Sequence, residues 1–193
     1  AGTMRWTGLT LAIALMAGCA TAPPPNYYTL DLAQSATATA TVNVLPLRVD
    51  LSERLDRPGI YIQQSPTEAT YYANDHWAAP LDTLVREKLE AELPRVAGRA
   101  SVPIDVEVLR FGQRDTAQGA QAEAELLVRY RNPHAGTSGK VLREASYTSV
   151  RTPATPTPGD LTVELSRALE DIAAHVARDA AEVAAQAPRP EPY

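Results

Sequence analysis

The single cysteine of this 193-residue chain, Cys19, constrains both how the protein folds and where it resides. One cysteine allows no intrachain disulfide and no thiolate metal site, so the fold has to depend on a hydrophobic core. Hydrophobic residues make up 45% of the chain, which is enough to build such a core in one domain of this length. We therefore expect a single domain that is held together by packing rather than by cross-links.

Cys19 ends a segment with the pattern of a bacterial lipoprotein signal peptide. One basic residue, Arg5, precedes an apolar run over residues 6–17, and residues 15–19 read Leu-Met-Ala-Gly-Cys. The run is shorter than the ~20 residues that a transmembrane helix needs. The pattern predicts cleavage before Cys19 and a covalent diacylglycerol and N-acyl chain on this residue, which together anchor a protein stably to a membrane. The alternative is that Cys19 is a small buried residue of an ordinary helix.

This interpretation divides the chain into four segments. Ala20 follows Cys19 where an aspartate would favour retention at the inner membrane, so we expect sorting to the outer membrane. Three consecutive prolines, Pro23 to Pro25, stiffen the start of the mature chain. The predicted segments are a signal peptide (1–18, with 1–3 a cloning remnant or a misplaced start), a lipidated tether (19–26), a folded domain (27–186) and a flexible tail (187–193).

Hydrophobic periodicity predicts several short strands and then a helix in the first half of the domain. The helix covers residues 77–93, with Pro80 in its first turn and Asn74 or Asp75 as its cap. Alternating or β-branched runs predict strands before it, over residues 26–32, 41–49, 60–63 and 70–72.

The second half of the domain has the clearest strand signals in the chain. Alternation over residues 102–111, 120–131 and 140–151, with turn formers between these runs, predicts an antiparallel meander. A second amphipathic helix follows, from a cap at Asp160 to about residue 187. The fold class is therefore α+β: a two-layer sandwich of a mixed, mostly antiparallel sheet and two amphipathic helices.

The alternation also predicts which side chains of the meander form the core. Leu126 should face inward, against Leu165 and Leu169 of the second helix, whereas Glu123 should lie on the solvated face.

The sequence lacks the patterns of an enzyme or a metal site. Its three histidines fall in different elements and have no ligand spacing, and there is neither a Gly-x-Ser-x-Gly motif nor a phosphate-binding loop. Asp105 and Glu107 share a strand face, which we interpret as solvated rather than as a catalytic carboxylate pair. The net charge is −5, and no basic patch interleaved with aromatics suggests nucleic acid. We expect no enzyme activity, no metal and no cofactor besides the lipid on Cys19.

Four motifs, taken together, carry a family resemblance. They are residues 27–30 (Tyr-Tyr-Thr-Leu), 42–46 (Val-Asn-Val-Leu-Pro), 55–60 (Leu-Asp-Arg-Pro-Gly-Ile) and 77–81 (Trp-Ala-Ala-Pro-Leu). In this order, after a lipidated cysteine, they resemble the ABC-type transport auxiliary lipoprotein family, and the resemblance extends over residues 27–183.

The resemblance implies a fold, a location and partners. The fold would be similar to the N-terminal domain of TolB, and the protein would be an outer-membrane lipoprotein facing the periplasm. Its partners would be an MCE (mammalian cell entry) domain protein, a permease and an ATPase that move lipids between the two membranes, and it would assemble into a homo-oligomeric ring. The alternative is a structural envelope lipoprotein with a TolB-like domain and no role in transport.

Four residues within or near these motifs are candidate contacts with a partner or a lipid: Leu55, Arg57, Tyr61 and Trp77. Arginine and tyrosine are enriched at binding hot spots, and the planar guanidinium of arginine suits a phosphate headgroup. Each residue also has a structural interpretation. Trp77 can be part of the core at a helix start, and Arg57 can form a surface ion pair with Asp56. Tyr27 and Tyr28 can either anchor at the bilayer interface or pack in the sheet.

Overall fold

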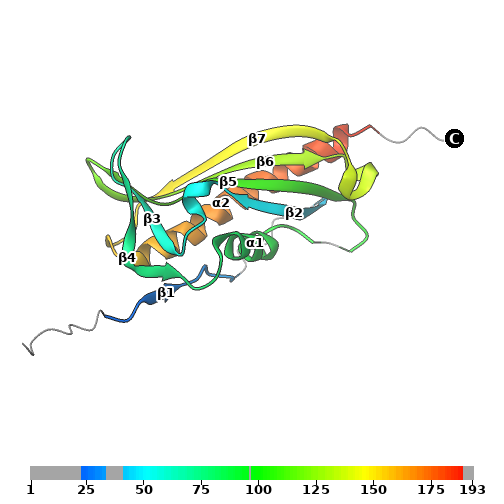
Figure 1. Cartoon of the computed structure of the whole chain (residues 1–193). Coiled ribbons are helices and arrows are strands. Elements are labelled where there is room, and N and C mark those ends of the chain that lie inside the picture. The colour runs from blue at the N-terminus through cyan, green and yellow to red at the C-terminus, as the bar shows by residue number, and fades with distance from the viewer. Residues whose placement is uncertain (1–22, 34–40, 96, 189–193) are drawn as a thin grey trace, which may run out of the picture.

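The computed structural model describes residues 23–33, 41–95 and 97–188, so the predicted signal peptide, Cys19 and most of the tether lie outside the described residues. The chain forms one mixed sheet of seven strands with two helices, which confirms the predicted α+β class (Figure 1). The strands are β1 (Asn26–Tyr28), β2 (Asn43–Leu51), β3 (Gly59–Gln63), β4 (Ala69–Trp77), β5 (Ser101–Thr116), β6 (Gly119–Arg131) and β7 (Val141–Arg151). The helices are α1 (Leu81–Glu92) and α2 (Pro158–Gln186), and the 3-10 turns are η1 (Glu53–Leu55) and η2 (Pro133–Ser138).

The 16-residue strand β5 organises the sheet, whose order is β1-β4-β3-β5-β6-β7. Along one edge, the first half of β5 pairs in parallel with β2 and its second half pairs in parallel with β3. Along the other edge, β6 pairs with β5 in antiparallel orientation from Ile104 to Thr116, and β7 completes the predicted meander. Because β2 and β3 share one edge of β5, the chain between them, residues 52–58, has to cross the place where one pairing ends and the other begins.

The core lies between the sheet and the helices. Helix α2 runs along the inner face of β5, β6 and β7, and α1 packs against β2 and α2 (Figure 1). Leu126, Leu165 and Leu169 are each fully buried, as the alternation of the meander predicts.

The start of α1 differs from the prediction, because β4 is longer than the sequence suggests. Trp77 is the last residue of β4, and Asn74 and Asp75 lie in this strand rather than at a helix cap. The pairing of β4 with β3 on one side and with β1 on the other supplies the hydrogen bonds that favour the strand. Helix α1 therefore begins at Leu81, and Pro80 is its N-cap residue, with an extended backbone.

The cap of α2 is also different from the one predicted. Thr157, not Asp160, is the N-cap residue, and its hydroxyl accepts a hydrogen bond from the Asp160 backbone N–H at 3.3 Å. Pro158 follows at the first helical position, where its missing N–H is unneeded. The Asp160 carboxylate instead accepts a bond from the Thr155 backbone N–H at 2.9 Å.

Glu123 lies on the predicted face of β6, but the expectation that it is solvated is wrong. The residue is only 6% exposed, and its carboxylate lies 3.5 Å from Arg110 and 3.6 Å from Arg114. The strand partner opposite Glu123 is Gly112, which also pairs with Tyr61 of β3 on its other side: a Cβ on Gly112 would lie 2.3 Å from the Tyr61 carbonyl oxygen.

Candidate functional site

The connector between β2 and β3, residues 52–58, forms one wall of the candidate site. Ser52 keeps the connector against β5, because its backbone N–H donates to the Val108 carbonyl at 2.9 Å and its hydroxyl donates to the Leu109 carbonyl at 3.2 Å. The chain then turns through η1, where the Leu55 N–H donates to the Ser52 carbonyl at 2.8 Å. The turn directs the Leu55 side chain inward, so that this residue is 3% exposed.

The junction between β4 and α1 forms the opposite wall. The Trp77 backbone N–H donates to the Pro58 carbonyl at 2.8 Å, which joins the junction to the connector. The next N–H, of Ala78, donates to the Tyr28 carbonyl at 2.8 Å, which joins it to β1. Backbone hydrogen bonds on both sides thus hold the junction in place.

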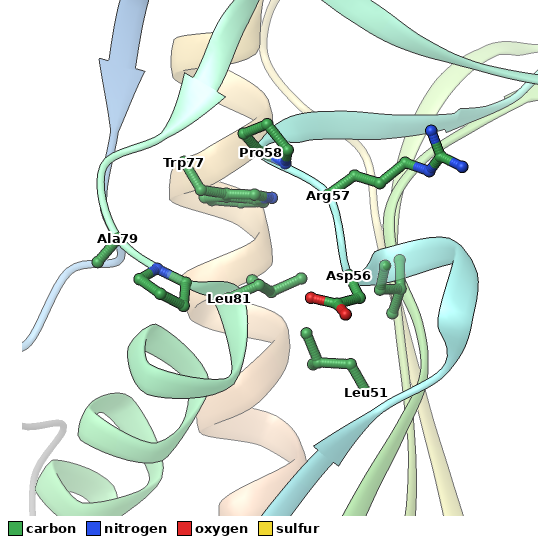
Figure 2. Close-up of a pocket in the computed structure, with 9 residues that line it drawn as sticks. Leu51, Asp56, Arg57, Pro58, Trp77, Ala79 and Leu81 are labelled. Atoms are coloured by element: carbon green, nitrogen blue, oxygen red, sulfur yellow. The ribbon is translucent and has the colours of Figure 1, made fainter.

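A surface pocket of about 390 Å³ lies between these two walls (Figure 2). Its walls are mainly apolar, and the Asp56 carboxylate points into it, whereas the Arg57 side chain extends away from it (Figure 2). The residues that line it are Leu51, Leu55, Asp56, Arg57, Pro58, Trp77, Ala79, Pro80 and Leu81.

The structure brings three of the four predicted contact residues to this pocket. Leu55, Arg57 and Trp77 line it, but Tyr61 does not. Tyr61 is 7% exposed, donates a hydrogen bond from its hydroxyl to the Gln63 side chain at 2.7 Å, and packs edge-on against Tyr71 at a centroid distance of 5.8 Å. Within this chain, Tyr61 is therefore a packing residue.

Burial separates the remaining three residues into two groups. Leu55 is buried, and Trp77, at 5% exposure, lies 5.8 Å from the ring of Phe111, so both belong to the core and present only part of their surface to the pocket. Arg57 is exposed, and its guanidinium carbon lies 5.6 Å from the centroid of the Tyr71 ring. Among the ion pairs of the described residues, none joins Arg57 to Asp56, so the cation–π contact replaces the ion pair that the sequence suggested.

The two tyrosines of β1 have different environments. Tyr28 is half-buried, packs against the core and donates from its hydroxyl to Asp75 at 3.1 Å, as expected for a residue of the sheet. Tyr27 is 64% exposed, and its ring lies in an edge-to-face arrangement with that of His76, with 6.1 Å between the centroids. Of the two, Tyr27 is the side chain that is available to an external surface.

Sequence reasoning missed Asp56 as a pocket residue. The sequence signal was its position between Leu55 and Arg57, two residues that were already candidate contacts. Asp56 is the one acidic side chain among the described residues that line the pocket, and it would attract a cation or a hydrogen-bond donor.

The pocket has the chemistry of a binding site. It can accept an apolar group whose neighbour is cationic, and Arg57 at its rim can contact an acidic group. Across the described residues, no three or more His, Cys, Asp or Glu side chains are grouped so that they could hold a metal ion. None of the described helices has the length and apolar character needed to span a bilayer.

The fold has counterparts among solved structures. A crystal structure of a Xanthomonas campestris protein assigned to the family model DUF330 has a TM-score of 0.66 and 16% identity, and the match covers 83% of this chain and 99% of that one. The crystal structure of an uncharacterised protein has a TM-score of 0.57 and 18% identity, over 81% of this chain and 99% of that one. Both likenesses concern the fold alone. No curated protein matches the chain significantly in sequence.

A family model gives the more specific result. The model of the ABC-type transport auxiliary lipoprotein component matches residues 28–177, which include all of the pocket and every strand after β1. This range nearly coincides with residues 27–183, over which the sequence motifs carry the resemblance. The chain therefore belongs to the family of ABC-type transport auxiliary lipoprotein components.

Proposed function

We propose that this protein is a non-enzymatic outer-membrane lipoprotein that docks the periplasmic MCE-domain protein of an ABC-type lipid transport system to the outer membrane. Its family is that of an auxiliary component of ABC-type transport, which supports a role beside a transporter. The observation that carries the docking role is the pairing of Tyr28 with Trp77, because it joins the pocket to the start of the folded domain.

This pairing keeps the pocket close to the anchor. Tyr28 follows Cys19 by nine residues, and a chain of that length spans at most about 30 Å when fully extended. Tyr28 and Trp77 are register partners in β1 and β4, so the pocket wall at Trp77 would be tied to a lipid on Cys19 by this length of chain. A partner bound at the pocket would consequently be held near the membrane surface that carries the acyl chains.

The chemistry of the pocket supports a protein partner. An apolar side chain of the partner would enter between Leu51 and Leu81, beside Trp77, while a basic neighbour would face Asp56. Arg57, held over the Tyr71 ring, would contact an acidic group of the same partner at the rim.

The choice of the outer membrane depends on the start of the mature chain. Ala20 stands where an aspartate would favour retention at the inner membrane, and we therefore assign the anchor to the outer membrane. Two or more acyl chains on Cys19 would provide stable attachment without a transmembrane helix.

Envelope fractionation with a Cys19→Ser variant tests the anchor and its location. The parent chain should label with a radioactive fatty acid and co-sediment with outer-membrane markers in a density gradient. The variant should lose the label and either remain uncleaved or appear in the soluble periplasmic fraction. Labelling of the variant would contradict lipidation at Cys19, and co-sedimentation of the parent with inner-membrane markers would contradict the outer-membrane location.

A further inference from the structure

Strand β1 presents an aromatic side chain on the outside of the domain. Tyr27 is 64% exposed, the largest value among the large apolar side chains of the described residues, and Leu32 follows at 48%. The two most exposed of these side chains thus lie in the first described segment, residues 23–33, which is the part of the folded chain nearest in sequence to Cys19. Exposed apolar side chains are common on protein surfaces, so the surroundings of Tyr27 decide whether it has a role.

Strand pairing fixes the backbone that carries Tyr27. Strand β1 pairs in parallel with β4, and the Ala78 backbone N–H donates to the Tyr28 carbonyl at 2.8 Å. On either side of Tyr27, the Asn26 amide and the Tyr28 hydroxyl both donate to the Asp75 carboxylate, at 3.0 Å and 3.1 Å. Successive side chains of a strand point to opposite faces, so the contacts that hold Tyr28 against the core direct Tyr27 outward.

The two chain segments that meet at this pairing contain no aspartate, glutamate, lysine or arginine. They are residues 23–30, which include β1, and residues 76–81, which lead from the end of β4 into α1. The Tyr27 ring lies against that of His76 in the second segment, with 6.1 Å between the centroids. Such a surface suits the headgroup layer of a bilayer, because a tyrosine combines an apolar ring with a polar hydroxyl and is enriched at membrane–water interfaces.

The length of chain before β1 brings this surface to the membrane. Tyr27 follows Cys19 by eight residues, which span at most about 28 Å when fully extended. Acyl chains on Cys19 would keep β1 within that distance of the bilayer, but a single flexible attachment does not set the orientation of the domain. The net charge of −5 also gives no general attraction to anionic lipids. A side chain at the β1 end therefore has to supply the second contact.

We propose that Tyr27 is an interfacial anchor, whose ring lies in the headgroup layer of the membrane that holds Cys19 and orients the domain with β1 against the bilayer. This inference rests on the proposed lipidation of Cys19, and it assigns to Tyr27 a role that the lipid alone does not fill. In this orientation β6 and β7, which lie across the molecule from β1 in Figure 1, face away from the membrane.

Fluorescence quenching by brominated phospholipids tests the position of Tyr27. The lipidated chain is reconstituted into vesicles of phosphatidylethanolamine and phosphatidylglycerol, with Tyr27→Trp as the probe and Leu142→Trp, at a 38% exposed side chain of β7, as the matched control. Brominated lipid should quench the added emission of Tyr27→Trp by about twofold or more and leave that of Leu142→Trp unchanged. The parent chain measures the background emission of the buried Trp77.

A second measurement tests the orientation of the domain. Ala78→Cys places a thiol at an exposed position beside β1, and this thiol is the one available for labelling once Cys19 is acylated. A fluorophore at this thiol should be quenched by phospholipids that carry a nitroxide on the headgroup. Tyr27→Ser should lower this quenching by about twofold or more, whereas Tyr27→Phe, which keeps the ring, should lower it less.

Two results would overturn this role of Tyr27 while leaving the lipid anchor intact. The first is a chain that floats with the vesicles although Tyr27→Trp is quenched no more than Leu142→Trp. The second is a Tyr27→Ser variant whose label at position 78 is quenched as strongly as in the chain with Tyr27. A parent chain that does not float with the vesicles would instead contradict the lipid anchor, and the role of Tyr27 with it.

Discussion

The ammonium group of Lys88 on α1 lies 2.7 Å from a carboxylate oxygen of Glu170 on α2, and the Lys88 side chain is completely buried. The same ammonium donates to Glu92 at 2.8 Å and to the backbone carbonyl of Ala33 at 3.3 Å. All three donors of the lysine thus have an acceptor. These bonds join α1, α2 and the segment after β1, and so they fix the position of the helix that begins at the pocket.

The first prediction concerns this cluster. Lys88→Met should lower the free energy of unfolding by about 2–4 kcal/mol, because it leaves the Glu92 and Glu170 carboxylates near each other without their cation. Lys140→Met, at an exposed position, is the control and should change it by less than about 0.5 kcal/mol. Urea denaturation measures both values. Equal, small effects would show that Lys88 does not hold the two helices together.

The second prediction compares two glycines. Gly112→Ala should lower the free energy of unfolding by about 1–3 kcal/mol, because the new methyl group would lie 2.3 Å from the Tyr61 carbonyl oxygen and would force β3 away from β5. Gly159→Ala, in the first turn of α2, should be neutral or stabilising by up to about 1 kcal/mol, since the nearest atom would be 3.9 Å away. Thermal denaturation of the two variants tests the close approach of β3 to β5, and a stable Gly112→Ala variant would disprove it.

The third prediction concerns the stability of the folded protein at high pH. Burial, followed by the hydrogen bond to Asp179, raises the pKa of Tyr147 to about 12, and burial also raises the pKa of Tyr130, whose hydroxyl lies 2.5 Å from that of Tyr147. A tyrosine in the unfolded chain loses its proton near pH ~10. The contribution of Tyr147 to stability is therefore fully present below pH ~10 and is lost as the pH rises from there to about 12.

Unfolding by urea at several pH values between 9 and 12 checks this dependence. Tyr147→Phe should make stability fall less steeply over this interval than in the parent chain. Tyr27→Phe, which removes a hydroxyl from a side chain that is 64% exposed, is the matched variant for comparison. A parent chain and a Tyr147→Phe variant with the same pH dependence would contradict the role of this hydroxyl.

The meander could be predicted from the sequence because each of its strands carries its own signal. The alternation of Ala122, Ala124, Leu126 and Val128 with polar residues identifies both the strand and its buried face. Pairings between distant segments have no such signal. That β2 and β3 share one edge of β5, and that β1 and β3 extend β4 as far as Trp77, depends on hydrogen bonds between segments that are far apart in the chain.

The candidate site, like the fold, could be predicted from the sequence only in part. Leu55, Arg57 and Trp77 stood out by residue type and do meet at one pocket, but the sequence could not show that only Arg57 among them is exposed. Glu123 was misplaced for a related reason. Period-two alternation gives the face of a strand, but it does not show that Arg110 and Arg114 form ion pairs with Glu123 on that face.

The fourth prediction concerns Arg57. Arg57→Ala should lower the melting temperature very little, because the contact of an exposed guanidinium with the Tyr71 ring is worth only about 0.5–1 kcal/mol. It should weaken binding of the proposed MCE-domain partner by about 1–3 kcal/mol if the guanidinium forms a charge-assisted bond with it. Arg48→Ala, at a side chain that is 71% exposed on β2, is the matched control for loss of positive charge. An Arg57→Ala variant that melts much earlier than its parent would assign this residue to the fold instead.

Co-purification from detergent-solubilised envelopes tests the central claim most directly. The lipidated chain, tagged at its C-terminus, should retain an MCE-domain protein identified by mass spectrometry, and bound lipid should be present in the same fraction. Arg57→Ala should reduce the amount of this partner by about fivefold or more, whereas Arg48→Ala should not. Recovery of the folded, lipidated chain without an MCE-domain protein or any other transporter subunit would contradict the account and would favour a structural envelope lipoprotein.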